Sequence, residues 1–297
     1  MTAPRIDRSR FFLPEHLTPL FYTPVYRELG VDERRAYNQL HGLYFNEQFL
    51  FFESTLPAAM IAPLLADPRL AALAGDLERY IADETEHGGW FRALNRACAP
   101  DLYARADFRF IRVSPLVRRL WTAAPRRLDW FPWVLWLAMI QEEKATWYAR
   151  EFLRQEGELE PGFVAVQRRH LESEGAHEGY AAALLERFWD RANGRVRRLN
   201  ARIFAWVLRE FFTVPRRSGL RVVAAWFDRS PALEPRLPLI REQLLALGGD
   251  PAYLRSHYGP HVVPRTLARL RRHAEFDGLS AYFSNLARPR RASEAGA

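Results

Sequence analysis

Two stretches of the chain carry a glutamate and a histidine three residues apart. Glu84 is followed by His87, and Glu174 is followed by His177. On an α-helix, residues three or four apart share one face, so each pair can present a carboxylate and an imidazole to the same point. His170 lies one turn before Glu174 and shares the face of the second pair. Carboxylate oxygens and imidazole nitrogens are side-chain ligands of iron, manganese and zinc.

Each pair follows another glutamate at the same distance. Glu53 lies thirty-one residues before Glu84, and Glu143 lies thirty-one residues before Glu174. One Glu from each of two helices, with Glu-x-x-His from each of two others, is the ligand pattern of carboxylate-bridged di-metal sites in four-helix bundles. The pattern predicts such a site, with the ligands Glu53, Glu84, His87, Glu143, His170, Glu174 and His177.

The predicted glutamate ligands have apolar neighbours on their helix faces. Trp136, Ile140 and Trp147, for example, surround Glu143. A buried ionised carboxylate is costly unless it is paired or bound to a metal. No lysine or arginine lies on the same faces, so two divalent cations are expected to balance the four carboxylates.

The ligand from the first helix has a competitor. Glu47 also has apolar neighbours, but Glu53 is favoured because its distance to Glu84 matches the spacing in the second half of the chain. Glu142 and Glu172 are interpreted as solvated residues. Whether Glu47 or Glu53 is the ligand stays open at this stage.

The lone cysteine, Cys98, excludes an intramolecular disulfide and a cysteine-based metal site. A mixed carboxylate and imidazole set suits iron or manganese, and iron is favoured. The polar segment 1–10 lacks the apolar core of a signal peptide, so a cytoplasmic location is expected. The longest apolar run, residues 130–140, is about half the ~20 residues that a membrane span requires, so no membrane anchor is expected.

Bulk composition indicates a globular protein. Its 297 residues are 48% hydrophobic and 13% aromatic, and its formal net charge is +8. Nearly all basic residues are arginines scattered along the chain, which is typical of a surface of Arg/Glu helix pairs. Since no nucleic-acid-binding motif accompanies the charge, binding to nucleic acid is not expected.

Four helices must position the predicted ligands. They are expected at residues 33–59, 70 or 76 to 97, 131–155 and 163–192, with a crossover connection over 99–128 that holds one short helix. The turn at 156–162 would place Glu143 and Glu174 at the same height in an antiparallel hairpin.

The predicted fold is therefore all-α: a ferritin-like four-helix bundle with a di-metal centre and a C-terminal helical extension. We divide the chain into a lead-in over 1–31 that wraps the bundle, the bundle over 32–212, and an extension over 213–297 packed on the bundle. Further helices are predicted at 196–212, 220–227, 237–247 and 264–273, followed by a frayed tail at 288–297. The extension also holds His257, His261 and His273, interpreted as surface or loop residues.

The motifs resemble those of the ferritin-like di-iron oxygenases related to p-aminobenzoate N-oxygenase. The resemblance rests on Asp83-Glu84-Thr85-Glu86-His87 on one helix and His170-x-x-x-Glu174-x-x-His177 on another. The distinctive match is His170, because this family carries a third histidine one turn before the last Glu-x-x-His. The resemblance covers roughly residues 32–192.

The resemblance implies that the seven predicted ligands hold two iron ions, with manganese as the alternative. It implies a diferrous centre that binds O2, forms a peroxo-diferric species and transfers oxygen to a small organic substrate. In this family the third histidine is associated with the oxidation of amines. An external electron donor and a homodimer are the expected partners.

The sequence departs from the family pattern beside the ligands. Glu86 stands where family members often carry arginine, and Ser173 and Ala176 suggest altered hydrogen bonding around the metal. Gly175 is expected to clear space for O2 or substrate. Candidate residues for lining an apolar substrate pocket are Tyr44, Phe45, Phe49, Trp136 and Trp147.

Two other functions fit the same ligands. A ferritin-like ferroxidase or metal-binding protein would need no substrate pocket, and a metal-dependent hydrolase would use a bound hydroxide. The long C-terminal region argues against a subunit of a ferritin cage.

Overall fold

A computed structural model describes residues 6–174, 177–213 and 216–281. These residues form helices and turns, with no strand among them and one isolated β-bridge between Phe11 and Leu159. The predicted all-α, ferritin-like fold is confirmed. The predictions for Gly175, Ala176 and the tail from Arg288 to Ala297 concern positions outside the described residues.

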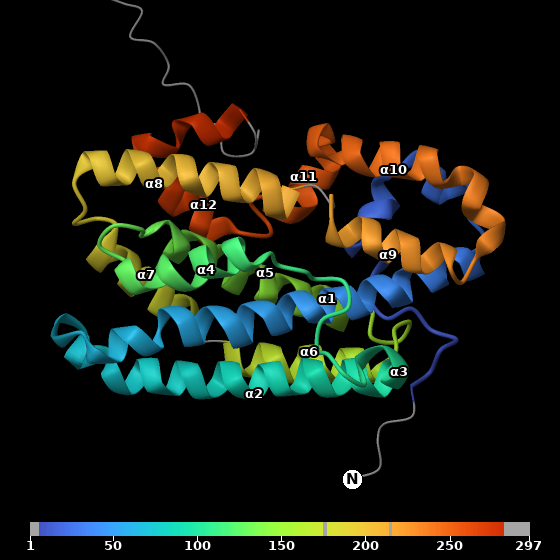
Figure 1. Cartoon of the computed structure of the whole chain (residues 1–297), viewed down its shortest axis with the longest axis horizontal. Coiled ribbons are helices and arrows are strands. Elements are labelled where there is room, and N and C mark those ends of the chain that lie inside the picture. The colour runs from blue at the N-terminus through green and yellow to red at the C-terminus, as the bar shows by residue number, and fades with distance from the viewer. Residues whose placement is uncertain (1–5, 175–176, 214–215, 282–297) are drawn as a thin grey trace, which may run out of the picture.

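The long helices that carry the predicted ligands pack along one another (Figure 1). Helices α1, Val31–Met60, and α2, Ala74–Cys98, form an extensive pair, and α5, Trp133–Arg154, packs against both α6, Pro161–Ser173, and α7, His177–Phe188. Their starts and ends lie close to the predicted ones, because prolines and capping residues mark them in the sequence. At the start of α6, Pro161 is the first helical residue and the Glu160 side chain accepts a hydrogen bond from the amide of Phe163.

The fourth predicted helix, 163–192, is divided into α6 and α7. Helix α6 ends at Ser173, whose hydroxyl oxygen lies 2.9 Å from the carbonyl oxygen of His170 and donates to it. Such local bonds from serine to the preceding turn bend helices and compete with their regular hydrogen bonding. The expectation of one continuous helix was therefore wrong, although Glu174 and His177 still face the same partners.

The crossover between α2 and α5 is anchored by a buried carboxylate. It contains α3, Pro100–Tyr103, and α4, Pro115–Ala123, rather than one short helix. Glu47 on α1 accepts hydrogen bonds from the Tyr103 hydroxyl and from the backbone amides of Arg109, Phe110 and Ile111. The charge of Glu47 thus holds the crossover against α1.

The segment before α1 packs onto the helices in three 3₁₀ turns, Glu15–Leu17, Pro19–Tyr22 and Pro24–Glu28. Leu13, Leu20 and Val25 are fully buried there. These apolar contacts agree with a lead-in that wraps the bundle.

The C-terminal part is a series of short helices on the same body (Figure 1). They are α8, Gly194–Val207; a π-helical turn, Leu208–Thr213; α9, Ser218–Phe227; α10, Leu237–Ala246; α11, Pro251–Tyr258; and α12, Pro264–Leu270. Helix α11 was not predicted, although Asp250 before Pro251 is a helix start signal and its carboxylate accepts from the Tyr253 amide. Helix α9 packs on α1 and α12 packs on α5. The division at residue 212 stays a prediction.

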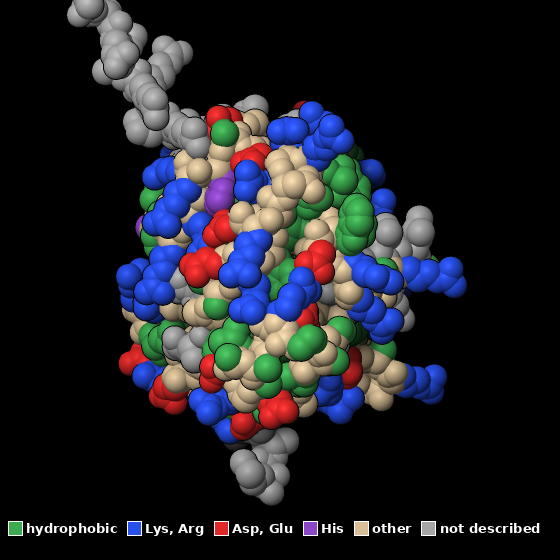
Figure 2. Space-filling model, turned by 90° about the vertical axis from the view of Figure 1, so that its left-hand side faces the viewer, with side chains coloured by type: hydrophobic (Ala, Val, Ile, Leu, Met, Phe, Trp, Pro, Cys, Tyr) green, Lys and Arg blue, Asp and Glu red, His purple; other side chains and the backbone are tan. Residues whose placement is uncertain are grey.

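The surface shows no single basic band on the face that Figure 2 presents, where arginines are interspersed with acidic and apolar side chains. None of the described helices combines the length and the apolar character needed to cross a membrane.

We predict that Gly42→Ala lowers the free energy of unfolding by about 1–3 kcal/mol. A Cβ at Gly42 on α1 would lie 2.7 Å from the Cβ of Phe12, an atom next to the backbone that cannot rotate away. Gly89→Ala on α2 is the matched control. No atom lies within 4 Å of the added Cβ there, so a gain of roughly 0.5–1 kcal/mol is expected. Urea unfolding measures both values, and equal effects of the two changes would contradict the packing argument.

Candidate metal centre

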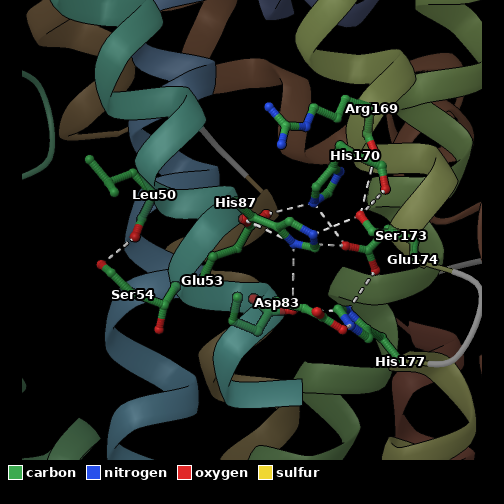
Figure 3. Close-up of polar contacts among 12 residues, drawn as sticks. Leu50, Glu53, Ser54, Asp83, His87, Arg169, His170, Ser173, Glu174 and His177 are labelled. Carbon is green, nitrogen blue, oxygen red and sulfur yellow. Dashed lines mark hydrogen bonds and ion pairs between the residues drawn. The ribbon is translucent and has the colours of Figure 1, made fainter. Parts of the chain in front are cut away.

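Acidic and imidazole side chains from α1, α2, α6 and α7 converge at one buried point (Figure 3). The Nδ1 atom of His177 lies 3.0 Å from Oε1 of Glu84 and 3.2 Å from Oε2 of Glu174. The Nε2 atom of His170 lies 2.8 Å from Oε1 of Glu174 and 3.0 Å from Oε1 of Glu53. Six of the seven predicted ligands are thus brought together, and we call them the glutamate–histidine cluster: Glu53, Glu84, His87, His170, Glu174 and His177.

The cluster divides into two groups that could each hold one ion. Glu84, His87, Glu174 and His177 offer ligand atoms within 4.8 Å of one another, and so do Glu53, His87 and His170. Every cluster side chain is buried, the most exposed being Glu53 at 7%. The two groups overlap at His87, whose inward nitrogen can bind only one ion.

Outer hydrogen bonds fix which nitrogen of two histidines faces the cluster. The Ser173 hydroxyl donates its only proton to the His170 carbonyl, so it accepts from Nε2 of His87 at 2.7 Å. The Asp83 carboxylate accepts from Nε2 of His177 at 3.3 Å. Both rings therefore turn Nδ1 inward, the orientation that such outer partners give to metal-bound histidines. Ser173, for which the sequence suggested altered hydrogen bonding near the metal, thus orients His87. The sequence analysis did not identify the corresponding role of Asp83 toward His177.

Several inward-facing atoms have no hydrogen-bond partner among the described residues. They include Oε2 of Glu53, Nδ1 of His87, Oε2 of Glu174 and Nδ1 of His177. Buried polar atoms are nearly always satisfied, and exceptions call for an explanation such as a bound ion. Because these atoms are carboxylate oxygens and imidazole nitrogens pointing at one another, the residues fit a divalent metal.

Burial and mutual repulsion oppose ionisation of two of the acids, Glu53 and Glu84, whereas the neighbouring histidines lower the pKa of Glu174. Burial raises the pKa of Glu53 to about 7 and the pKa of Glu84 to about 8, and the charge of Glu174 adds to both increases. Burial lowers the pKa of His177, but the adjacent carboxylates of Glu174 and Glu84 outweigh it and raise this pKa to about 12. A metal would replace the Nδ1 proton of this imidazole and supply the positive charge that the carboxylates require.

Glu143 is not part of the cluster, which corrects the prediction from spacing. Its Oε1 accepts from the backbone amide of Arg265 and its Oε2 from that of Thr266, each at 2.7 Å. These amides open helix α12, where the first N–H groups have no partner within the helix and a carboxylate is favoured. Glu143 therefore ties the C-terminal helices to α5 instead of binding an ion.

Glu142, the residue before Glu143 on α5, lies beside the cluster. One of its oxygens lies 3.9 Å from Nδ1 of His177, and the Tyr80 hydroxyl donates to the other at 2.7 Å. Burial raises the pKa of Glu142 well above its usual value, and the charges of Glu174 and Glu84 raise it further. The interpretation of Glu142 as a solvated residue was wrong.

The competition between Glu47 and Glu53 also has a geometric answer. The oxygens of Glu47 are taken up by the crossover amides, whereas Glu53 lies 3.0 Å from His170. The structure thus places Glu53, and not Glu47, beside the other candidate ligands.

The cluster borders a cavity of about 110 Å³, which we call the inner cavity. Glu53, Glu84, Glu142 and Glu174 lie at one end, and Tyr44, Phe45 and Phe49 are among the walls, as predicted. Trp136 and Trp147 are core residues that do not line it. Trp136 packs on Trp189, and Trp147 packs on His16.

The inner cavity is also lined by Lys144, His41 and His257. Lys144 is 6% exposed, and its Nζ lies 5.0 Å and 5.6 Å from the ring centroids of Tyr258 and Tyr148. Burial lowers the pKa of this ammonium to about 7. The interpretation of His257 as a surface or loop residue was wrong, because it lies in α11 and lines this cavity.

Glu86, which stands in the position of a family arginine, is paired across the helices. Arg169 on α6 donates to its carboxylate at 2.6 Å, and the guanidinium lies 4.0 Å from the ring centroid of Trp90. A salt bridge thus joins α2 and α6 outside the cluster.

Comparison with known families agrees with this site. A family model described as "P-aminobenzoate N-oxygenase AurF" matches residues 2–227. The match is longer than the 32–192 expected from the motifs, since it also includes the lead-in, α8 and α9. A comparison with curated proteins gives no match.

We predict that Glu142→Gln removes bound metal, whereas Glu143→Gln retains it. The first change removes a carboxylate that lies beside the cluster, and the second weakens only the cap of α12, at a cost of about 1–3 kcal/mol of unfolding free energy. Metal per chain, measured by mass spectrometry on iron-supplied protein, and urea unfolding separate the two. Glu172→Gln, at an exposed position of α6, is the control. Loss of metal in Glu143→Gln, with full retention in Glu142→Gln, would reverse the assignment.

Proposed function

Since the chain belongs to the p-aminobenzoate N-oxygenase family AurF, we propose that it is an O2-dependent di-iron oxygenase that oxidises the nitrogen of a small amine. The observation that carries the proposal is the buried glutamate–histidine cluster at the end of an apolar cavity. Glu53, Glu84, Glu142 and Glu174, with His87, His170 and His177, would hold two iron ions. Four carboxylates balance two divalent cations, which removes the cost of burying them.

Iron supplies the redox chemistry of such a centre, taking electrons from an external donor and activating O2 for transfer of an oxygen atom. The protein's contribution is geometry and exclusion of water. Phe45 and Phe49 present an apolar wall to the space beside the carboxylates, and Tyr80 holds Glu142 toward them. His170, the histidine beyond the two Glu-x-x-His pairs, touches both Glu53 and Glu174, so it is placed to join both groups of ligands.

Lys144 indicates that the substrate also carries an acidic group. It is the only lysine of the chain, and no ion pair or hydrogen bond to its ammonium occurs within the described residues. A buried cation without a counter-charge is costly, and an anion bound in the cavity removes that cost. An amine that also carries an acidic group, as p-aminobenzoate does, would place its nitrogen toward the cluster and its carboxylate toward Lys144.

We expect the reduced, iron-loaded protein to convert p-aminobenzoate to a nitrogen-oxidised product when O2 is added. Label from isotopic O2 should appear in that product by mass spectrometry, because the transferred atom comes from O2. Oxidation of iron that proceeds equally with and without any amine, and that leaves amines unchanged, would favour a ferroxidase. Activity of a zinc-loaded protein without O2 would favour a hydrolase.

Replacing Lys144 by methionine tests the acid-binding end of the cavity. Loss of a charged hydrogen bond of about 1.5–3 kcal/mol should raise KM for p-aminobenzoate by roughly tenfold to a hundredfold. The uncharged p-aminobenzamide is the control, and its KM should not increase. Steady-state kinetics of both substrates with both proteins give the four values. A parallel rise for the two substrates would show that Lys144 acts on packing and not on the carboxylate.

A further inference from the structure

A second, larger cavity lies on the other side of one wall of the inner cavity. It measures about 310 Å³, within the roughly 300–1,000 Å³ of small-molecule sites, and we call it the outer chamber. The two spaces share five lining residues: Tyr44, Gln48, Phe52, Phe211 and Phe212. Only side chains therefore separate the outer chamber from the space beside the glutamate–histidine cluster.

The walls of the outer chamber are aromatic. Phe52 on α1 and Phe212 in the π-helical turn pack with ring centroids 5.6 Å apart, and Trp206 and Phe211 form a second pair at 5.6 Å. Trp206 is 48% exposed and Phe211 is 40% exposed, unusually high for large apolar side chains. π-Helical turns frequently occur at functional sites, and this one supplies residues to both cavities. Flat rings with free faces suit a planar aromatic ligand.

The rim of the outer chamber is cationic. Arg112, Arg216 and Arg217 line it, and only Arg216 is paired, with Glu210 at 2.9 Å. Neither Arg112 nor Arg217 forms an ion pair in the part of the chain that the structure describes. Two guanidinium groups without a counter-ion at the mouth of a cavity favour an anion.

A third guanidinium adds to this positive charge. Arg221 donates to the carbonyl of Phe110 at 2.8 Å, and its pKa is lowered by burial and by the charges of Arg112 and Arg217. The acidic group that opposes this effect is Glu47, but its oxygens already accept the amides of the crossover. The protein therefore gathers arginine side chains here without a free carboxylate to balance them.

We propose that the outer chamber binds a planar aromatic anion, with its ring among Trp206, Phe211 and Phe52 and its acidic group on Arg112 and Arg217. The site holds that molecule against the wall of the inner cavity. Its purpose rests on the proposed function, since such a molecule is either a substrate on its way to the metal centre or a reduced flavin mononucleotide that delivers electrons to it.

Binding of 2-naphthoate and of flavin mononucleotide to the resting, iron-loaded protein, measured by titration calorimetry, tests the proposal. At least one of the two should bind, and the double variant Arg112→Gln/Arg217→Gln should weaken that binding at least tenfold. The matched control is Arg241→Gln/Arg255→Gln, two exposed arginines of α10 and α11 that should leave the affinity unchanged. Trp206→Ala should weaken binding, whereas Trp130→Ala, at a 66% exposed tryptophan outside the chamber, should not.

The two probes distinguish the sources of the ligand. Binding of naphthoate alone indicates a site for substrate entry, and binding of the flavin indicates a site for the electron donor. Failure of both probes to bind, or equal affinity in the Arg112→Gln/Arg217→Gln variant, would overturn the proposal. Neither measurement involves turnover, so an inactive enzyme that still binds a probe through these arginines would contradict the proposed function and leave the chamber intact.

Discussion

The structure depends on the cost of burying several carboxylates and imidazoles together at one site. Glu84 and Glu174 lie within hydrogen-bonding distance of His177, and all three side chains are buried away from water. In such an environment every charge must meet an opposite charge or a set of oriented dipoles. The helices α1, α2, α5, α6 and α7 are arranged so that these groups meet one another, and a pair of divalent ions is the partner that fits their number and chemistry.

The same constraint explains the buried glutamates outside the cluster. Glu47 is satisfied by three amides and a tyrosine hydroxyl, and in this way it fixes the crossover. Glu143 is satisfied by the first amides of α12, and in this way it fixes the C-terminal helices. Two adjacent residues of α5 consequently have different roles. Glu142 faces the cluster, and Glu143 faces the start of α12.

Aromatic side chains line both the inner cavity and the outer chamber. Phe52 and Phe212 stand between the inner cavity and the outer chamber, while Lys144 and the arginines provide positive charge at positions away from the cluster. An acidic, aromatic molecule would thus meet positive charge both in the outer chamber, from the arginines, and in the inner cavity, from Lys144.

The sequence alone determined the helical fold, the approximate starts and ends of α1, α2 and α5, and most of the cluster, because helical periodicity fixes which residues share a face and Glu-x-x-His spacing is local. It could not decide between Glu142 and Glu143. Neighbouring residues on a helix point about 100° apart, and which direction faces the cluster depends on how α5 rotates against α2 and α7. It also could not show that Glu47 binds crossover amides, that Asp83 orients His177, or that His257 in α11 meets Lys144 across a cavity. Each of these contacts joins segments far apart in the chain, so only tertiary packing sets them.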